Sequence, residues 1–225
     1  MNLEGFNDNQ KKAVLHKDGA CVVIAGAGSG KTRVLTYRIA NLIEQGVAPE
    51  NILAVTFTKK ESEMKERLID LIGIDGEQVN MGTFHSICYH ILRAENKTIS
   101  SSTIAKDWWQ KKIVKEIMLP PSTKYPKGIN LDWQPRQALG GIGFQKNNLI
   151  IPDDIKFLEY KLRKLYQYYE EAKTYENVID FDDMLVKCYD LLKNNPEILQ
   201  KYRDKFKYIL VDEYQDTNFA QYYIV

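Results

Sequence analysis

The sequence is short of net charge, of cysteine and of long apolar runs. Its 31 Lys and Arg residues nearly balance 30 Asp and Glu residues, which leaves a formal charge of +1 at pH 7. A chain with so little charge has no general attraction for nucleic acid, so any such binding must come from local patches. Two of the 3 cysteines lie in apolar runs and none forms a Cys-x-x-Cys pair, which indicates reduced, buried thiols.

No apolar run approaches the roughly 18 residues that a membrane-spanning helix requires, and no signal peptide is evident. Internal repeats and low-complexity tracts are also absent. Together with the reduced cysteines, these absences lead us to expect a cytoplasmic protein that does not bind membranes. With 225 residues, 44% of them apolar, the chain can form one large domain or two small ones.

A glycine-rich turn near the N-terminus carries the first chemical signal. The apolar run at residues 21–25 predicts a strand, and helical periodicity begins just after the turn. The alternating glycines lack a Cβ, so the backbone can curl and point successive N–H groups at one anion. The following helix adds the positive end of its dipole. The predicted phosphate loop comprises Ala25, Gly26, Ala27, Gly28, Ser29, Gly30, Lys31 and Thr32.

The two residues that end this loop have the chemistry that a nucleotide requires. Lys31 would reach the β- and γ-phosphates, and the Thr32 hydroxyl would ligate Mg²⁺. Ala25 stands where the usual pattern Gly-x-x-x-x-Gly-Lys-Ser/Thr has glycine, which a loop tolerates when φ is negative there. The alternative is a turn that merely ends a strand, but it explains neither the alternating glycines nor the Gly-Lys-Thr sequence.

An acidic pair about 180 residues later supplies the second half of such a site. The run Tyr208–Val211 predicts an apolar strand, and Asp212 and Glu213 follow it directly. Asp212 would hold Mg²⁺ directly or through water, because this ion needs hard oxygen ligands. Glu213 would orient and deprotonate an attacking water, which favours hydrolysis over phosphate transfer to a small molecule. The alternative is an ordinary acidic turn after a strand.

The rest of the chain alternates strand and helix patterns, which indicates a doubly wound α/β domain. Before the loop, Asn7 or Asp8 can cap a short helix that carries Gln10. The Gln10 amide could read an adenine edge, or it could simply face solvent. Strands are expected at residues 51–58 and 78–83, and helices at residues 30–46, 59–72 and 84–94.

Residues 108–174 differ in character, since they are helical in pattern and interrupted by prolines and a Gly-Gly pair. They contain 12 Lys or Arg residues against 7 Asp or Glu residues, and this basic excess could bind the phosphate backbone of a nucleic acid. A lysine-rich solvated face is an equally good alternative. Just beyond them, Asp180, Asp182 and Asp183 begin a helix, and we expect them to cap it rather than to bind a metal.

Several segments resemble the motifs of superfamily 1A DNA helicases of the UvrD/Rep/PcrA type, in that family's order. The two most specific are residues 25–35, similar to motif I, and residues 211–218, similar to motif II. The other similar segments are residues 6–13, 52–58, 63–67, 82–86 and 180–184. The resemblance implies a RecA-like parallel sheet with helices on both faces, built from residues 1–107 and 175–225 as motor domain 1A. Residues 108–174 would form an inserted, mainly helical domain 1B.

The resemblance also implies ATP and Mg²⁺ as cofactors and assigns roles around them. Arg33 would lie against the adenine, Gln10 would read its edge, and Gln215 would sense the γ-phosphate. Single-stranded DNA, including its junctions with duplex DNA, would be the partner. It would cross the motor surface, with a base stacked on Phe57. The implied DNA-binding residues are Phe57, Thr83, Phe84 and His85.

The implied activity is that of an ATP-dependent DNA helicase that moves 3′ to 5′ on single-stranded DNA. The family's second motor domain, with its catalytic arginines, is not among these 225 residues. We therefore expect a monomeric fragment that binds Mg·ATP weakly, hydrolyses it very slowly and does not unwind DNA alone. Two alternatives are a nucleotide-gated DNA-binding module without motor activity, and part of a helicase–nuclease.

Overall fold

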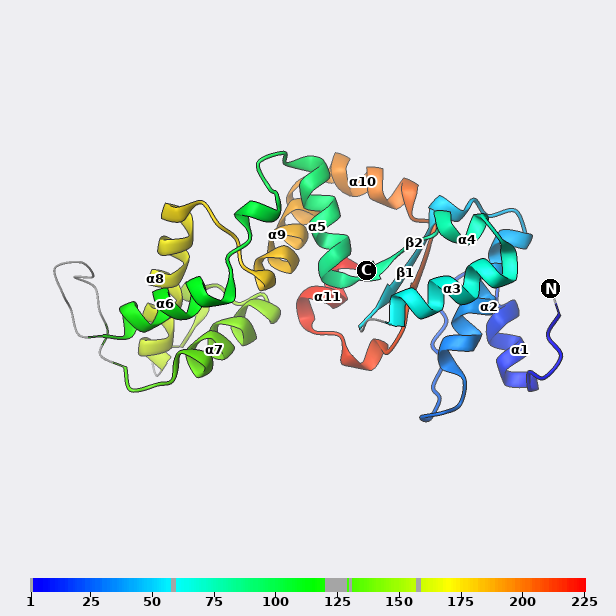
Figure 1. Ribbon diagram of the computed structural model, residues 1–225, viewed down its shortest axis with the longest axis horizontal. Coiled ribbons are helices and arrows are strands. Elements are labelled where there is room, and N and C mark those ends of the chain that lie inside the picture. The colour runs from blue at the N-terminus through cyan, green and yellow to red at the C-terminus, as the bar shows by residue number, and fades with distance from the viewer. Residues whose placement is uncertain (1, 58–59, 120–128, 130, 157–158) are drawn as a thin grey trace. The chain divides into compact units, whose positions relative to one another are not determined.

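The computed structural model describes residues 2–57, 60–119, 129, 131–156 and 159–225, without the side chains at 60 and 61. The chain forms two compact units (Figure 1). The first unit comprises residues 1–87 and 195–217, and the second comprises residues 88–194 and 218–225.

A parallel sheet with the strand order β2-β1-β3 forms the centre of the first unit. The central strand β1 (Ile52–Thr56) pairs with β2 (Asn80–Thr83) on one side and with β3 (Tyr208–Val211) on the other. All five residues of β1 are buried, as expected for a parallel strand that is covered on both faces. The α/β class and the strands expected at residues 51–58, 78–83 and 208–211 are confirmed.

One face of this sheet packs against two helices in a buried apolar cluster (Figure 1). Ile39 and Leu42 contribute from one helix and Leu68 from the other, and they meet Ile52 and Ala54 of β1. A further helix packs on the first of these through the buried side chains Val14 and Val34 and others. The helices of the first unit are α1 (Asp8–Leu15), α2 (Lys31–Glu44), α3 (Lys60–Ile72), α4 (Asp75–Gln78) and α10 (Pro196–Lys205).

The predicted strand at residues 21–25 is wrong. These residues have no regular secondary structure, and Val22 and Ile24 are 76% and 95% exposed. An apolar run forms a strand only where a neighbouring strand accepts its backbone hydrogen bonds, and none of the described strands pairs with it. Cys21 is therefore exposed, whereas Cys88 and Cys188 are the buried thiols.

The second unit is helical and has its own apolar core. Val114, Ile142, Leu165 and Tyr169 are among its most deeply buried residues, and they come from three different helices. The helices of this unit are α6 (Asp107–Met118), α7 (Pro135–Asn147), α8 (Tyr160–Glu176), α9 (Phe181–Asn194), α11 (Phe219–Ile224) and most of α5 (Phe84–Glu95).

The two units divide the chain at other positions than the predicted domains 1A and 1B do. Contacts group α9, α11 and most of α5 with the helical unit, whereas the resemblance assigns them to domain 1A. The predicted boundaries at residues 108 and 174 remain a prediction. Within the described residues, every helix is too short or too polar to span a bilayer.

Candidate nucleotide-binding site

The glycine-rich loop forms a tight turn directly before α2. Gly28 and Gly30 have φ values of +74° and +81°, a region that side chains with a Cβ enter only with strain. The Ser29 hydroxyl closes the turn by donating to the Gly26 carbonyl over 2.7 Å. Gly30 is the N-cap of α2, and its carbonyl accepts the Val34 N–H over 2.9 Å. The unpaired N–H groups of the first helical turn therefore begin at the end of the loop.

Lys31 brings positive charge to the inside of this turn. Its ammonium donates to the carbonyl oxygens of Ala25 and Gly26 over 3.3 and 3.4 Å. It also lies 3.9 Å from the carboxylate oxygen Oε2 of Glu213, with both side chains roughly one-quarter exposed. The loop and the acidic pair thus face each other, although they are separated by most of the chain.

The acidic pair stands at the carboxyl end of β3. The Asp212 N–H donates to the Val55 carbonyl over 2.9 Å, which continues the pairing of β3 with β1, and only 6% of Asp212 is exposed. Glu213 then turns the chain with a φ of +50°, a conformation that costs a non-glycine residue about 1–2 kcal/mol. Its carboxylate accepts a hydrogen bond from the Gln215 amide over 2.7 Å. Asp212 and the hydroxyl of Thr32 are hard oxygen donors, so the residues present fit Mg²⁺.

Two residues predicted to contact the adenine lie beside the loop. The Gln10 amide nitrogen donates to the Ser29 carbonyl over 3.0 Å, and its oxygen accepts the Asn7 N–H over 2.9 Å. The Arg33 guanidinium lies over the Phe6 ring, 4.1 Å from its centroid. This cation–π contact holds the exposed Arg33 guanidinium against the Phe6 ring.

Comparison with known proteins fits this arrangement. The family described as UvrD/REP helicase N-terminal domain matches residues 6–225. The chain belongs to the UvrD/REP helicase family. ATP-dependent DNA helicase PcrA of Staphylococcus aureus strain Mu50 is 40% identical over a 236-residue alignment that covers 99% of this chain. PcrA of Staphylococcus epidermidis strain RP62A is 39% identical over the same length. This UvrD/REP-type chain spans 31% of the length of these curated relatives.

The residues that the resemblance assigned to DNA lie at the ends of β1 and β2. Because Thr56 pairs with Thr83 in the parallel sheet, Phe57 and Thr83 share the carboxyl edge with the acidic pair. The Phe57 ring is partly exposed and packs edge-on against Phe84, with centroids 5.6 Å apart. Phe84 itself is only 3% exposed, so it supports Phe57 from the core.

Thr83, the last residue of β2, and His85, the second residue of α5, lie where that strand passes into the helix. The Thr83 hydroxyl oxygen accepts the Ser86 N–H over 3.3 Å and so caps the helix. Burial lowers the pKa of the adjacent His85 to about 4, which leaves its imidazole neutral at neutral pH.

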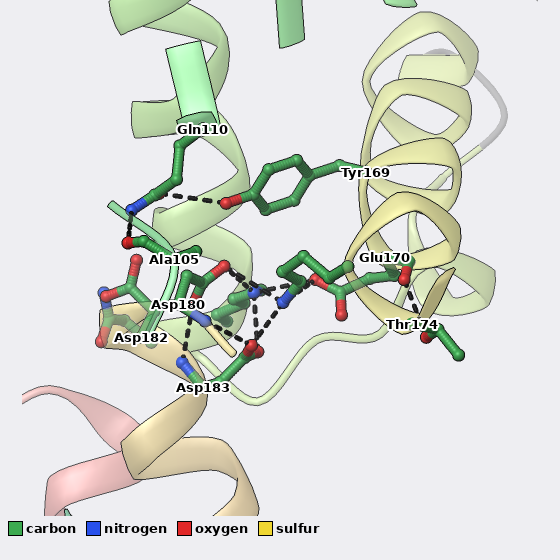
Figure 2. Close-up of polar contacts among 11 residues, drawn as sticks. Ala105, Gln110, Tyr169, Glu170, Thr174, Asp180, Asp182 and Asp183 are labelled. Atoms are coloured by element: carbon green, nitrogen blue, oxygen red, sulfur yellow. Dashed lines mark hydrogen bonds and ion pairs between the residues drawn. The ribbon is translucent and has the colours of Figure 1, made fainter. Parts of the chain in front are cut away.

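Sequence reasoning missed a buried ionic cluster in the second unit (Figure 2). Lys146 of α7 is 2% exposed and lies 2.6–2.8 Å from carboxylate oxygens of Glu170, Asp180 and Asp183. Lys173 of α8 contacts the same three carboxylates. The three carboxylates lie close enough together to hold a metal ion, and the ammonium groups of Lys146 and Lys173 offset two of their three negative charges.

The prediction that the acidic residues cap α9 is confirmed for Asp180 and Asp183, whereas the Asp182 carboxylate accepts a hydrogen bond from the Asn147 side chain over 3.1 Å. The Asp180 N–H donates to Asp183 over 2.9 Å, and the Asp183 N–H donates to Asp180 over 2.8 Å, as in a capping box. Burial alone would raise the pKa of Asp180, but Lys146 and Lys173 outweigh it and lower that pKa to about 2. Burial alone would lower the pKa of Lys146, but its carboxylate partners raise it well above the usual value.

The basic excess of residues 108–174 is divided between the interior and the surface. Lys146 and Lys173 are buried, so they cannot meet a phosphate backbone. Exposed cations do gather around a shallow depression of about 680 Å³ between α6 and the start of α7, beside the 62% exposed Trp108. These cations are Lys111, Lys112, Lys115 and Arg136.

Proposed function

We propose that this chain is the Mg·ATP-binding part of an ATP-dependent DNA helicase that moves 3′ to 5′ on single-stranded DNA. The observation that carries the proposal is the 3.9 Å separation of Lys31 Nζ and Glu213 Oε2. This separation brings the phosphate loop and the acidic pair within reach of one triphosphate. Family membership and the 40% identity to PcrA support the same activity.

The residues around the loop then take the following roles. The loop N–H groups and Lys31 bind the β- and γ-phosphates, and Thr32 and Asp212 hold Mg²⁺. The bound ion would neutralise charge on the phosphates. Glu213 accepts a proton from the attacking water, and Gln215, hydrogen-bonded to Glu213, responds to the γ-phosphate.

Adenine and DNA contacts extend this proposal. Gln10 and Arg33 contact the adenine, and single-stranded DNA, with its junctions to duplex, follows the carboxyl edge where Phe57 stacks on a base. Thr83 and His85 lie near that DNA, and Phe84 acts through Phe57. We also propose that the chain is monomeric and that the protein acts in the cytoplasm.

Titration calorimetry of this chain with Mg·ATP tests the phosphate site. Lys31→Ala should weaken binding at least about tenfold, because hydrogen bonds from a charged group contribute roughly 1.5–3 kcal/mol. Lys12→Ala, at an exposed position of α1, is the matched control and should leave the affinity unchanged. Equal affinities for both variants would remove Lys31 from the site.

Hydrolysis is tested in the full-length protein. Glu213→Gln should keep Mg·ATP binding and reduce turnover by at least about 100-fold, since it removes the general base. Single-stranded DNA should stimulate the ATPase of the unmodified protein. Undiminished turnover in Glu213→Gln would contradict the role of Glu213, and no stimulation by DNA would favour a nucleotide-gated binding module.

A further inference from the structure

We propose that Gln10 is a positioning residue for the phosphate loop, so that it governs the binding of a triphosphate whatever base is attached. This inference rests on the proposed function, because it assumes that the loop binds nucleotide phosphates. It assigns Gln10 a second role, separate from any contact that it makes with adenine.

The orientation of the Gln10 amide is determined from α1. Its oxygen accepts the Asn7 N–H over 2.9 Å, and the Gln10 N–H donates to the Asn7 side chain over 2.9 Å, which completes a capping box. The helix itself is anchored to α2 by the buried residues Val14 and Val34. With its oxygen held in this way, the amide nitrogen of Gln10 is directed at the Ser29 carbonyl, 3.0 Å away.

This hydrogen bond fixes one peptide plane of the loop. In a planar trans peptide the C=O and N–H groups point in opposite directions. When Gln10 holds the Ser29 carbonyl toward α1, the Gly30 N–H therefore points away from α1. Successive N–H groups of such a loop form the anion-binding surface, so the direction of this N–H bears directly on phosphate affinity.

The loop needs such a constraint because its glycines are conformationally free. Gly28 and Gly30 flank Ser29, and both adopt positive φ values. Glycine populates positive and negative φ about equally, so neither residue fixes the loop in this conformation. A Cβ added to Gly30 would lie 3.5 Å from the Gln10 amide nitrogen, so the amide packs directly against this part of the loop. Gln10 thus selects one of several conformations that the loop sequence alone allows.

Calorimetric titrations with Mg·ATP and with Mg·tripolyphosphate, which has no base or sugar, test the inference on the chain as it stands. Gln10→Ala should weaken Mg·tripolyphosphate about three- to tenfold, the effect of one neutral hydrogen bond, and should weaken Mg·ATP at least as much, since any contact with adenine is lost as well. Gln10→Met, which keeps the shape and removes both hydrogen-bonding groups, should behave in the same way. Asn9→Ala, at an exposed position of the same helix, should change neither affinity.

A loss confined to Mg·ATP, with tripolyphosphate unaffected, would overturn the inference and leave Gln10 as a base reader only. Unchanged affinity for both ligands in Gln10→Met would also overturn it. Thermal unfolding of each variant within a few degrees of the parent separates a local loop effect from general destabilisation. If the unmodified chain binds neither ligand, the proposed function fails before Gln10 is tested.

Discussion

Replacing Lys146 by methionine should destabilise the second unit by about 3–5 kcal/mol, the usual cost of removing one partner from a buried ion pair. Lys146 is 2% exposed and has three carboxylate partners, Glu170, Asp180 and Asp183, at 2.6–2.8 Å. Methionine keeps a stem of similar length and volume, so packing changes little and the loss is that of the charge.

The charge balance of the cluster explains why the cost is large. Three carboxylates meet two ammonium groups, so the loss of Lys146 leaves Lys173 alone to neutralise all three. Lys111→Met is the matched control, because Lys111 forms an exposed ion pair of 2.6 Å with Asp107. Exposed pairs of this kind contribute about 0–1 kcal/mol.

Urea unfolding followed by tryptophan fluorescence measures both variants. All 3 tryptophans, Trp108, Trp109 and Trp133, belong to the second unit, so their emission reports the unit that contains the cluster. We expect a lower free energy of unfolding for Lys146→Met at an unchanged denaturant slope. A loss below about 1 kcal/mol, no larger than that of Lys111→Met, would refute the argument that the cluster is held by its charge.

Three further predictions concern the loop and two titrating groups. Gly28→Ala should weaken Mg·ATP binding in calorimetry, since an alanine at φ +74° costs about 1–2 kcal/mol. Gly26→Ala should weaken it less, because Gly26 has a negative φ and open space around it. The low pKa of Asp180 stabilises the fold above pH 4, so the unfolding free energy should fall between about pH 4 and 2, and less steeply in Asp180→Asn. His85 should titrate near pH 4 by NMR, and stability should drop as pH falls from about 6.5 to 4, because the unfolded chain binds that proton first. A midpoint near 6.5 would show that His85 is solvated.

Local sequence patterns predict best those elements whose signal lies within the element itself or next to it. The near-continuous apolar run at residues 51–58 predicted a strand, and β1 (Ile52–Thr56) is buried at every position. Asn7 or Asp8 was expected to cap the first helix, and Asn7 does so with Gln10 as its partner. The proximity of Lys31 to Glu213 was expected because one Mg·ATP needs both the phosphate loop and an acidic pair, and the two side chains lie 3.9 Å apart although residues 21–25 form no strand of the sheet.

The buried ionic cluster could not be predicted because its partners are far apart in the chain. Lys146 and Lys173 have no local feature that separates them from the exposed lysines of the same segment. The Asp180–Asp183 spacing did predict a helix cap, but a cap needs only its own backbone. Only the packing of α7, α8 and α9 around one point converts these residues into ion pairs (Figure 2).

The apolar run before the loop does not form a strand for a related reason, and this affects what positions the phosphate loop. Residues 21–25 have the composition of a buried strand, but a strand also needs a neighbour, and none of the described strands pairs with them. The loop is therefore not positioned by sheet hydrogen bonds on its N-terminal side. Its conformation depends on α2, on Lys31, which donates to the Ala25 and Gly26 carbonyls, and on Gln10, which holds Ser29. Because Gln10 is the one of these contacts that comes from α1, its removal should disturb the loop while the sheet and α2 remain intact.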